Sequence, residues 1–571
     1  MTAKAPAPKT TKAVQATTAA QQAPAVNPAN APQTAVSRAA VPVFTDRIAI
    51  IGGGISGLIA AKTLSELGYH NNYLFEAQSM LGGNSSTQAV LIGAQTRWAD
   101  MGVNDYNTKT YLNIYRLICE LGAETFPLDD TTSYSTSDGT VSYTVDGLPN
   151  TGLPYPGMTP AAYQRFQTDI QYFWTSVYYV ATDPYFAGLT VAQYLAQPYN
   201  PKNPETPAHQ YGPDFESYYL LPRINGMYFV PVAGPQQMPI VLVTHYYVLQ
   251  EGYNQYGAPN PDRRYFSGGT RQLVERLQDW LLNDYELHAT NQVGDEVMGL
   301  NKFMLGCDAT LSDATGGGYL VRWNDPNTGP MQVGPFAGVI MAAHADAARQ
   351  CLGRLNPNLQ PNLPAVLQNL QGYSYEASTA YIHTDASALP RDVNAWRSFN
   401  IHIFDYPGTY PFNVPYTISY LENRHQNDAM NLTYRLQAYN SQFFTTLNPP
   451  TPILPRYVLP TPAGTPAVKT FYHNVATMNT MGLQSVLASL QESGALNNIY
   501  LTGGYTLGVG LHEECWISAN QAARRLVGQQ IAASLQTHGS AAVARAGVGY
   551  QADARPADHA PHYLRTALRA R

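Results

Sequence analysis

Short apolar runs separated by glycine-rich turns are the clearest pattern along this chain. Residues 48–51 are four apolar residues in succession, which suits a buried parallel strand. Apolar positions at helical spacing follow from residue 58 to residue 67, and Gly68 stands where a C-cap glycine is expected. Residues 73–75 then read as another strand. The pattern therefore predicts a strand, a glycine turn, a helix and a second strand in succession.

The glycines of this turn have the spacing of a dinucleotide-binding motif. Gly52 allows a sharp turn, Gly54 lets a pyrophosphate approach the backbone, and Gly57 lets the helix pack closely on the sheet. Glu76 follows Gly57 by 19 residues, where an acid can accept hydrogen bonds from an adenosine ribose. An ordinary glycine-rich turn is the alternative. The residues expected to contact the dinucleotide are Gly52, Gly54, Ile55, Ser56, Gly57, Glu76 and Ala77.

A second glycine turn near the far end of the chain fits the other half of a long cofactor. Residues 499–501 read as a last buried strand, and residues 508–514 lead into a helix that runs through Val527. The first motif does not distinguish NAD from FAD. If the dinucleotide is FAD, as a family resemblance carried by further residues implies, this turn can hold the flavin while the first turn holds the adenosine. A helix N-terminus near the flavin stabilises the negative charge that builds on reduction. We expect backbone amides near Leu511 and His512 to stabilise that charge. The residues of this turn expected to contact the cofactor are Gly503, Gly504, Gly510, Leu511 and His512.

Length, charge and cysteine content narrow the class of protein. The 571 residues amount to about four times a 150-residue domain, so one large core with insertions or two interleaved domains are both possible. The net charge of −6 and a charged fraction of 13% leave no basic footprint for nucleic acid. No secretory leader and no run of 18 apolar residues is evident, so we expect a cytoplasmic protein without a membrane span. The four scattered cysteines predict buried single thiols and neither a metal site nor a disulfide framework.

Three segments have a distinctive composition. Residues 1–45 are rich in Ala, Pro, Thr and Gln and contain no acid, which predicts a disordered tail. Residues 531–571 form a second, polar tail. Residues 150–260 are dense in tyrosine, whose apolar ring and polar tip suit the wall of a substrate cavity, although plain packing explains them equally well. The tyrosines in question are Tyr155, Tyr163, Tyr172, Tyr178, Tyr179, Tyr185 and Tyr194.

A glycine pair after Glu76 begins a resemblance to a known family. Gly82 and Gly83 resemble the pair that follows the ribose-binding strand in flavoproteins of the flavin-containing amine oxidase superfamily, and residues 99–104 and 265–270 are also similar to that group. The resemblance is to predicted NAD/FAD-binding oxidoreductases linked with fatty-acid modification, and more remotely to a flavoprotein polyunsaturated fatty acid isomerase. Asn84 departs from the arginine that often follows the pair.

The resemblance implies an α/β fold with α+β insertions, in which a Rossmann-type FAD-binding domain is interleaved with a substrate domain. The FAD-binding part would comprise residues 46–150, 255–350 and 490–530. The substrate part would comprise residues 151–254 and 351–489. FAD would also contact Gly82, Gly83, Asn84 and, near its adenine, Val297.

Two histidines are candidates for a role in the site. His383 with Asp385 resembles a family segment and could carry a proton, since a carboxylate can fix an imidazole tautomer. Residues two apart on a strand share a face, however, so a structural hydrogen bond is the alternative. His344, at the end of another apolar run, could belong to the site or simply cap the following helix.

The sequence thus predicts an FAD-dependent oxidoreductase that transfers a hydride between flavin N5 and a small apolar substrate, such as an unsaturated fatty acid. Leu511 matches the position where amine oxidases have an aromatic cage residue, and no lysine is evident near the flavin by resemblance. Both features disfavour amine oxidation. A redox-neutral double-bond isomerase, a flavin amine oxidase and a non-catalytic FAD-binding protein remain alternatives. The electron acceptor, the catalytic base and the oligomeric state are left open.

Overall fold

A computed structural model describes most of the chain between residues 46 and 538. The described ranges are 46–136, 142–144, 158–203, 208–228, 234–256, 262–289, 302–404, 416–426, 442–449 and 451–538. The segment expected to be a disordered tail, residues 1–45, lies outside them. Within the described ranges, no helix combines the length and the apolar character needed to cross a membrane.

A five-stranded parallel sheet is built from strands that lie far apart in the sequence. Its strands are, in order, β10 (Lys302–Leu305), β2 (Asn72–Glu76), β1 (Ile48–Ile51), β14 (Gly338–Met341) and β20 (Ile499–Leu501). Strand β1 is buried along its whole length, as its uninterrupted apolar run predicts. Each strand of this sheet comes from a segment that was expected to bind FAD.

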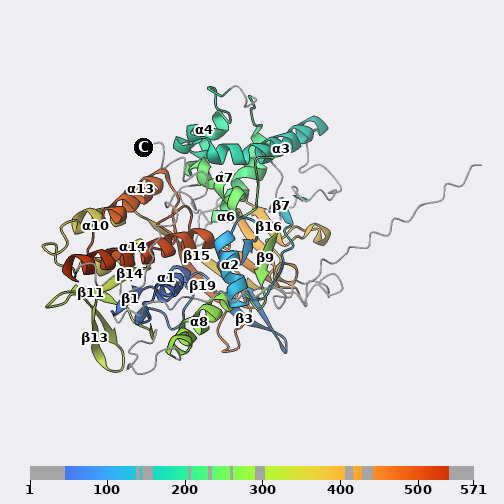
Figure 1. The fold of residues 1–571 in the computed structure, drawn as a ribbon. Helices are drawn as coiled ribbons and strands as arrows, with labels where there is room; N and C mark the ends of the chain where they lie inside the picture. The colour runs from blue at the N-terminus through green and yellow to red at the C-terminus, as the bar shows by residue number, and fades with distance from the viewer. Residues whose placement is uncertain are drawn as a thin grey trace, which may run out of the picture. The chain divides into compact units, whose positions relative to one another are not determined.

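Alternate residues of β1 face two different layers. Ile48 and Ile50 pack into a cluster with helices α1 (Ile55–Glu66), α2 (Leu112–Leu121), α8 (Arg271–Ala289) and α14 (His512–His538). Figure 1 shows α1, in blue, and α14, in red, side by side on this face. Ala49 and Ile51 pack on the other face, against the elements β11 (Thr310–Asp313), β12 (Tyr319–Asp325), β13 (Gly329–Phe336), α9 (Ala345–Leu352) and α10 (Leu363–Gln371).

A seven-stranded sheet is the largest sheet among the described residues. Its order is β19 (Val468–Asn474), β15 (Tyr375–His383), β18 (Phe444–Leu447), β17 (Tyr416–Leu421), β16 (Phe399–Ile403), β7 (Thr132–Thr136) and β8 (Ser142–Thr144). Helix α6 (Leu221–Tyr228) contacts β16 and β17. Farther out, α3 (Pro160–Thr182) packs on α7 (Ile240–Leu249), and both lie with α4 (Val191–Ala196) in the green part of Figure 1.

Shorter elements connect these layers. Two small sheets pair β3 (Thr87–Ile92) with β4 (Gln95–Asp100), and β9 (Arg263–Phe266) with both β5 (Asp105–Asn107) and β6 (Thr125–Pro127). The remaining helical segments are η2 (Pro184–Gly188), α5 (Pro213–Phe215), the π-helical η3 (Glu216–Leu220), η4 (Pro235–Gln237), η5 (Val393–Ala395), α11 (Glu422–His425) and α13 (Met478–Glu492).

The α/β fold class is confirmed, and three details differ from expectation. Strands β7 and β8 belong to the seven-stranded sheet, although residues 46–150 were assigned to the FAD-binding part. Helix α14 continues through His538, so the first eight residues of the expected polar tail are helical, as their alanines favour. Cys307, Cys351 and Cys515 are buried free thiols, but Cys119 is exposed on α2. The division into two domains stays a prediction.

Glu513, near the start of α14, accepts hydrogen bonds from the first residues of α2. Its carboxylate accepts hydrogen bonds from the Asn113 backbone N–H at 3.1 Å, the Asn113 amide at 2.6 Å and the Ile114 N–H at 2.9 Å. The residue is 4% exposed, and burial raises the pKa of its carboxyl. A side chain about 400 positions away in sequence therefore satisfies amides that a helix N-terminus leaves unpaired.

We expect Glu513→Ala to lower the free energy of unfolding by about 1–3 kcal/mol, because buried amides of α2 lose their acceptor. Denaturant unfolding followed by circular dichroism measures the change. Glu492→Ala is the matched control, since its carboxylate is 59% exposed and pairs with Arg525 at the surface, where such pairs contribute below about 1 kcal/mol. Equal stability of the two variants would contradict the assigned role.

Candidate functional site

A large cavity lies at the carboxyl ends of the parallel strands. Its volume is about 320 Å³, which lies within the range of small-molecule sites. Ligands of open α/β sheets bind beyond the carboxyl ends of strands in this way. The segments that follow β1, β2, β14 and β20 line it through Gly54, Ile55, Ser56, Gly82, Gly83, Asn84, Ala342, Ala343, His344, Gly503, Gly504 and Tyr505.

The first glycine turn has the geometry that its motif predicts. Gly52 has a φ of 111°, and a Cβ there would lie 2.5 Å from the carbonyl oxygen of Ala342. A Cβ at Gly57 would overlap the carbonyl oxygen of Gly52. The backbone of α1 is therefore in direct contact with the backbone of the turn. A Cβ at Gly54, by contrast, would meet nothing within 4 Å, and this residue lines the cavity. The turn is tight where it meets the sheet and open where a phosphate would approach.

The second glycine pair is bonded directly to the first turn. The Gly82 N–H donates to Gly53 O at 2.9 Å, and a Cβ at Gly83 would lie 3.2 Å from the Gly54 Cα. The carboxylate of Glu76 accepts the N–H of Gly53 at 2.7 Å and that of Gln78 at 2.8 Å. Glu76 therefore stabilises the first glycine turn by a hydrogen bond to its backbone. Four of the expected contacts do not line the cavity itself: Gly52, Gly57, Glu76 and Ala77.

The C-terminal glycine turn closes the opposite side of the cavity. A Cβ at Gly510 would lie 2.7 Å from the Gly504 Cα, so only glycine allows the two backbones to approach this closely. The Glu514 carboxylate accepts the N–H groups of Val509 at 3.1 Å, Gly510 at 2.9 Å and Leu511 at 2.9 Å. The turn is therefore fixed by a buried side chain of its own helix.

This arrangement corrects the expected role of the Leu511 amide. The amide was expected to stabilise a reduced flavin, but it donates to Glu514 instead. Glu514 also lies 3.1 Å from His245 Nε2 on α7. The Leu511 residue itself still lines the cavity. Of the two predicted amides, only that of His512 stays a candidate.

Three buried polar atoms on cavity-lining residues have no hydrogen-bond partner among the described residues: His512 Nδ1, Tyr505 Oη and Asn474 Oδ1. Leaving such an atom unpaired costs about 1–3 kcal/mol, so a polar ligand is expected beside them. All three lie in the C-terminal turn, at the start of α14 or at the end of β19. A heterocycle with carbonyl and N–H groups fits this set of donors and acceptors. The three atoms lie in the part of the cavity where the flavin was expected.

Beyond the two turns, the cavity continues into a chamber between α6 and the seven-stranded sheet. Its walls are mostly apolar or aromatic side chains: Met227, Tyr228, Phe399, Ile401, Ile418 and Tyr420. The Tyr228 hydroxyl donates to Leu242 O at 2.6 Å, so its polar tip is already bonded. Helix α6 lies close to the sheet at Gly226, where a Cβ would make ordinary contact with Ile418 at 3.5 Å and Ile401 at 3.6 Å.

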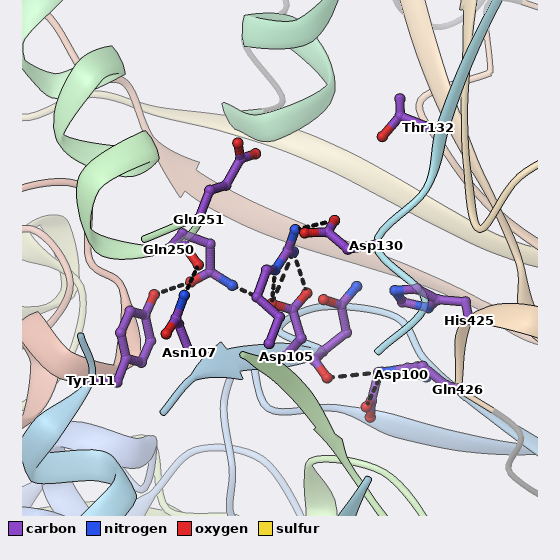
Figure 2. Close-up of polar contacts among 12 residues, drawn as sticks. Asp100, Asp105, Asn107, Tyr111, Asp130, Thr132, Gln250, Glu251, His425 and Gln426 are labelled. Carbon is purple, nitrogen blue, oxygen red and sulfur yellow. Dashed lines mark hydrogen bonds and ion pairs between the residues drawn. The ribbon is translucent and has the colours of Figure 1, made fainter. Parts of the chain in front are cut away.

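A buried network of charged groups forms one side of this chamber (Figure 2). Arg263 donates to both carboxylate oxygens of Asp105 at 2.9 Å and to Asp130 at 2.6 Å. Gln250 donates to Asp105 and accepts from Tyr111. The two carboxylates hold the pKa of Arg263 above its usual value despite burial. Each charge in this part of the network is therefore compensated by a bonded partner.

The second buried arginine is compensated in the same way. Arg223 forms an ion pair with Glu251, whose side chain is 9% exposed, and donates to Thr132 Oγ1 at 3.2 Å. Burial raises the pKa of Glu251. Arg223 and Arg263 both line the chamber but neither stands there as an uncompensated cation.

The two histidine candidates have different positions. His383 is fully buried away from the cavity, 2.7 Å from Thr446 Oγ1, and its Nδ1 accepts the Asp385 N–H at 3.1 Å. This favours the structural alternative over proton transfer, and burial lowers the pKa of His383 to about 4. His344 occupies the N-cap position of α9 without a side-chain cap bond, stacks on Tyr375 and lines the cavity.

The remaining expected residues are Val297 and the tyrosines of the dense segment. Val297 is outside the described residues. None of the described tyrosines named for the dense segment lines the cavity, and four of them, Tyr163, Tyr179, Tyr185 and Tyr194, pack into the core around α3. Two other tyrosines of residues 150–260, Tyr228 and Tyr246, do line it. The remaining lining tyrosines come from other segments: Tyr111, Tyr375, Tyr420, Tyr472 and Tyr505.

Comparison with known proteins now decides the family, because the family model described as flavin containing amine oxidoreductase matches residues 55–527. The chain belongs to this flavin containing amine oxidoreductase family. Membership confirms FAD as the cofactor.

Curated relatives in the family match over short stretches. A flavin-containing amine oxidase of Danio rerio is 33% identical over 120 residues, which are 21% of this chain and 21% of that protein. The amine oxidase B of Cavia porcellus is 39% identical over 83 residues, or 14% of this chain and 15% of that protein. The chain thus aligns with about a fifth or less of the length of these relatives.

Solved structures match over much more of the chain. A putative protoporphyrinogen oxidase from Exiguobacterium sp. covers 85% of this chain and 100% of its own, with a TM-score of 0.51 and 15% identity. A CLA-producing fatty acid isomerase from P. acnes covers 84% of this chain and 98% of its own, with a TM-score of 0.51 and 13% identity. At these identities the likeness establishes the fold alone.

We expect Gly57→Val to abolish FAD retention, because the added side chain would separate α1 from the Gly52 turn. The ratio of flavin absorbance to protein absorbance after purification measures this. Gly528→Val in α14 is the control, since a Cβ there meets nothing within 4 Å. A Gly57→Val protein that stays fully loaded with FAD would contradict the placement.

Proposed function

We propose that this oxidoreductase transfers a hydride between flavin N5 and a largely apolar, lipid-like substrate. The observation that carries the proposal is the chamber beyond the C-terminal glycine turn. Its walls from α6, β16 and β17 are apolar or aromatic, and its buried charges are paired among themselves. Such a surface binds by shape and apolar contact, because it offers no uncompensated charge to a polar substrate.

The cofactor would span the cavity from the first turn to the last. Gly54, Ile55 and Ser56 would hold the pyrophosphate together with Gly82, Gly83 and Asn84, and Glu76 would fix the first turn through the Gly53 N–H. Gly503, Gly504 and the segment Gly510 to His512 would surround the flavin end, where the unpaired polar atoms support a heterocycle. Bound FAD supplies a hydride acceptor at N5.

The residues of the chain would then position the substrate and exclude water. Helix α6 faces Ile401 and Ile418 across the chamber wall at Gly226, where a side chain larger than a methyl group would extend toward both. The paired network of Arg263, Asp105 and Gln250 forms a rigid polar wall that is bonded to itself and therefore does not need water. A dry, fixed site lowers the entropic part of the barrier to hydride transfer.

Two alternative reactions are isomerisation of the same kind of substrate and oxidation of an amine. A redox-neutral isomerase would return the hydride to another carbon of the same substrate, and one structural neighbour is a fatty acid isomerase. Amine oxidation is less favoured, because Leu511 lies at the cavity in place of an aromatic cage residue, and the described lining residues include no lysine.

Anaerobic mixing of the FAD-loaded protein with unsaturated fatty acids tests the proposal. Lasting loss of the oxidised flavin spectrum is expected for dehydrogenation, and a product shifted in double-bond position without lasting loss indicates isomerisation. Primary amines are the comparison substrates. Reduction by amines alone would overturn the proposal in favour of amine oxidation, and no reaction with any substrate would favour a non-catalytic protein.

We also expect Gly226→Leu to raise the KM for a lipid-like substrate at least about tenfold, because the side chain extends into the chamber. FAD content should not change, since Gly226 lies away from both glycine turns. Gly482→Leu on α13 is the control, because a Cβ there meets nothing within 4 Å. Unchanged kinetics for Gly226→Leu would show that the substrate binds elsewhere.

A further inference from the structure

We propose that the His512 side chain holds FAD by a hydrogen bond from Nδ1, and that Ser85 fixes the required tautomer through Nε2. The inference rests on the proposed placement of FAD in the cavity. It deepens that placement by assigning a role to a side chain where the sequence suggested only a backbone amide.

The geometry around the two ring nitrogens is asymmetric. His512 is the first residue of α14, is 3% exposed and lines the cavity. Its Nε2 lies 3.1 Å from the Ser85 hydroxyl oxygen. Its Nδ1 is buried and has no hydrogen-bond partner among the described residues. One nitrogen is thus held by the protein and the other is left for a ligand.

The position of the proton on the His512 ring determines whether the ligand must accept or donate a hydrogen bond at Nδ1. Burial lowers the pKa of His512 to about 4, so the ring is neutral at pH 7 and carries one proton. When the Ser85 hydroxyl donates to Nε2, the proton sits on Nδ1, which then becomes a donor. FAD suits such a donor, because its phosphates, ribityl hydroxyls and ring carbonyls are mostly acceptors.

The position of the pair fits a contact near the middle of the cofactor. Ser85 follows Gly83 of the turn assigned to the pyrophosphate, and His512 follows Gly510 of the turn assigned to the flavin. The hydrogen bond between them joins segments 427 positions apart in sequence. A donor at this junction would reach a ligand that passes from one turn to the other.

A purely structural role makes the opposite prediction about which nitrogen matters. If His512 only ties α14 to Ser85, then Nε2 is essential and Nδ1 is not. The amide nitrogen of asparagine approximates the position of Nδ1, whereas that of glutamine reaches the position of Nε2. His512→Asn and His512→Gln therefore each keep one of the two interactions.

The test compares FAD dissociation constants of the two full-length variants after removal and titration of the cofactor. We expect His512→Asn to bind FAD within about threefold of the native protein, and His512→Gln to bind it roughly five- to tenfold more weakly, as one lost hydrogen bond implies. The reverse order, or equal affinity of the glutamine variant and the native protein, would overturn the proposal.

Nitrogen NMR of the native protein labelled at histidine gives an independent readout. We expect the Nδ1 resonance of His512 to have a protonated-nitrogen shift that moves on FAD binding and is absent in His512→Gln. Ser85→Ala should weaken the preference for this tautomer. An unprotonated Nδ1 in the FAD-loaded protein would overturn the proposal.

Failure of this inference and failure of the proposed FAD site are distinguishable. If the native protein does not bind FAD at all, the placement of the cofactor is wrong. If it binds FAD and the two His512 variants match it, only the role of His512 is wrong. Thermal unfolding of the FAD-free variants identifies any loss of affinity that comes from misfolding.

Discussion

Contact between backbones at the carboxyl ends of the parallel strands is the constraint on which the cavity depends. Gly52 meets Ala342 after the neighbouring strand, and Gly510 meets Gly504 across the C-terminal turn, each at a distance that excludes a side chain. The walls there consist of peptide groups. Peptide N–H groups can donate to a phosphate or a heterocycle without filling the space that the ligand needs. The same close packing therefore shapes the sheet edge and leaves room for FAD.

Desolvation explains the composition of the chamber beyond these turns. An isolated buried charge is very costly, so Arg263 lies between Asp105 and Asp130, and Arg223 is paired with Glu251. Each of the two guanidinium groups contacts at least one carboxylate, and burial raises the pKa of Glu251. The chamber thus presents fixed dipoles and apolar surface, and its selectivity would come from shape.

The sequence predicted those parts of the site that local chemistry determines. Glycine spacing and apolar runs gave the first turn, its helix and the last strand correctly, because each depends on residues close in sequence. The Leu511 amide was misassigned because its partner is a carboxylate that folds back over the turn. Tyr505 and Asn474 carry no motif, and only tertiary packing brings them to the cavity. The tyrosine-rich segment could not be assigned because core and cavity favour the same side chains.

The first turn of α14 has a consequence for how the protein is made. Glu513 bonds the start of α2, Glu514 contacts His245 on α7, and β20 completes the parallel sheet beside β14. Strand β20 and the start of α14 follow the first glycine turn by several hundred residues in the sequence. The first turn therefore leaves the ribosome well before the segments that complete its cavity, and full enclosure of a ligand there has to await those segments.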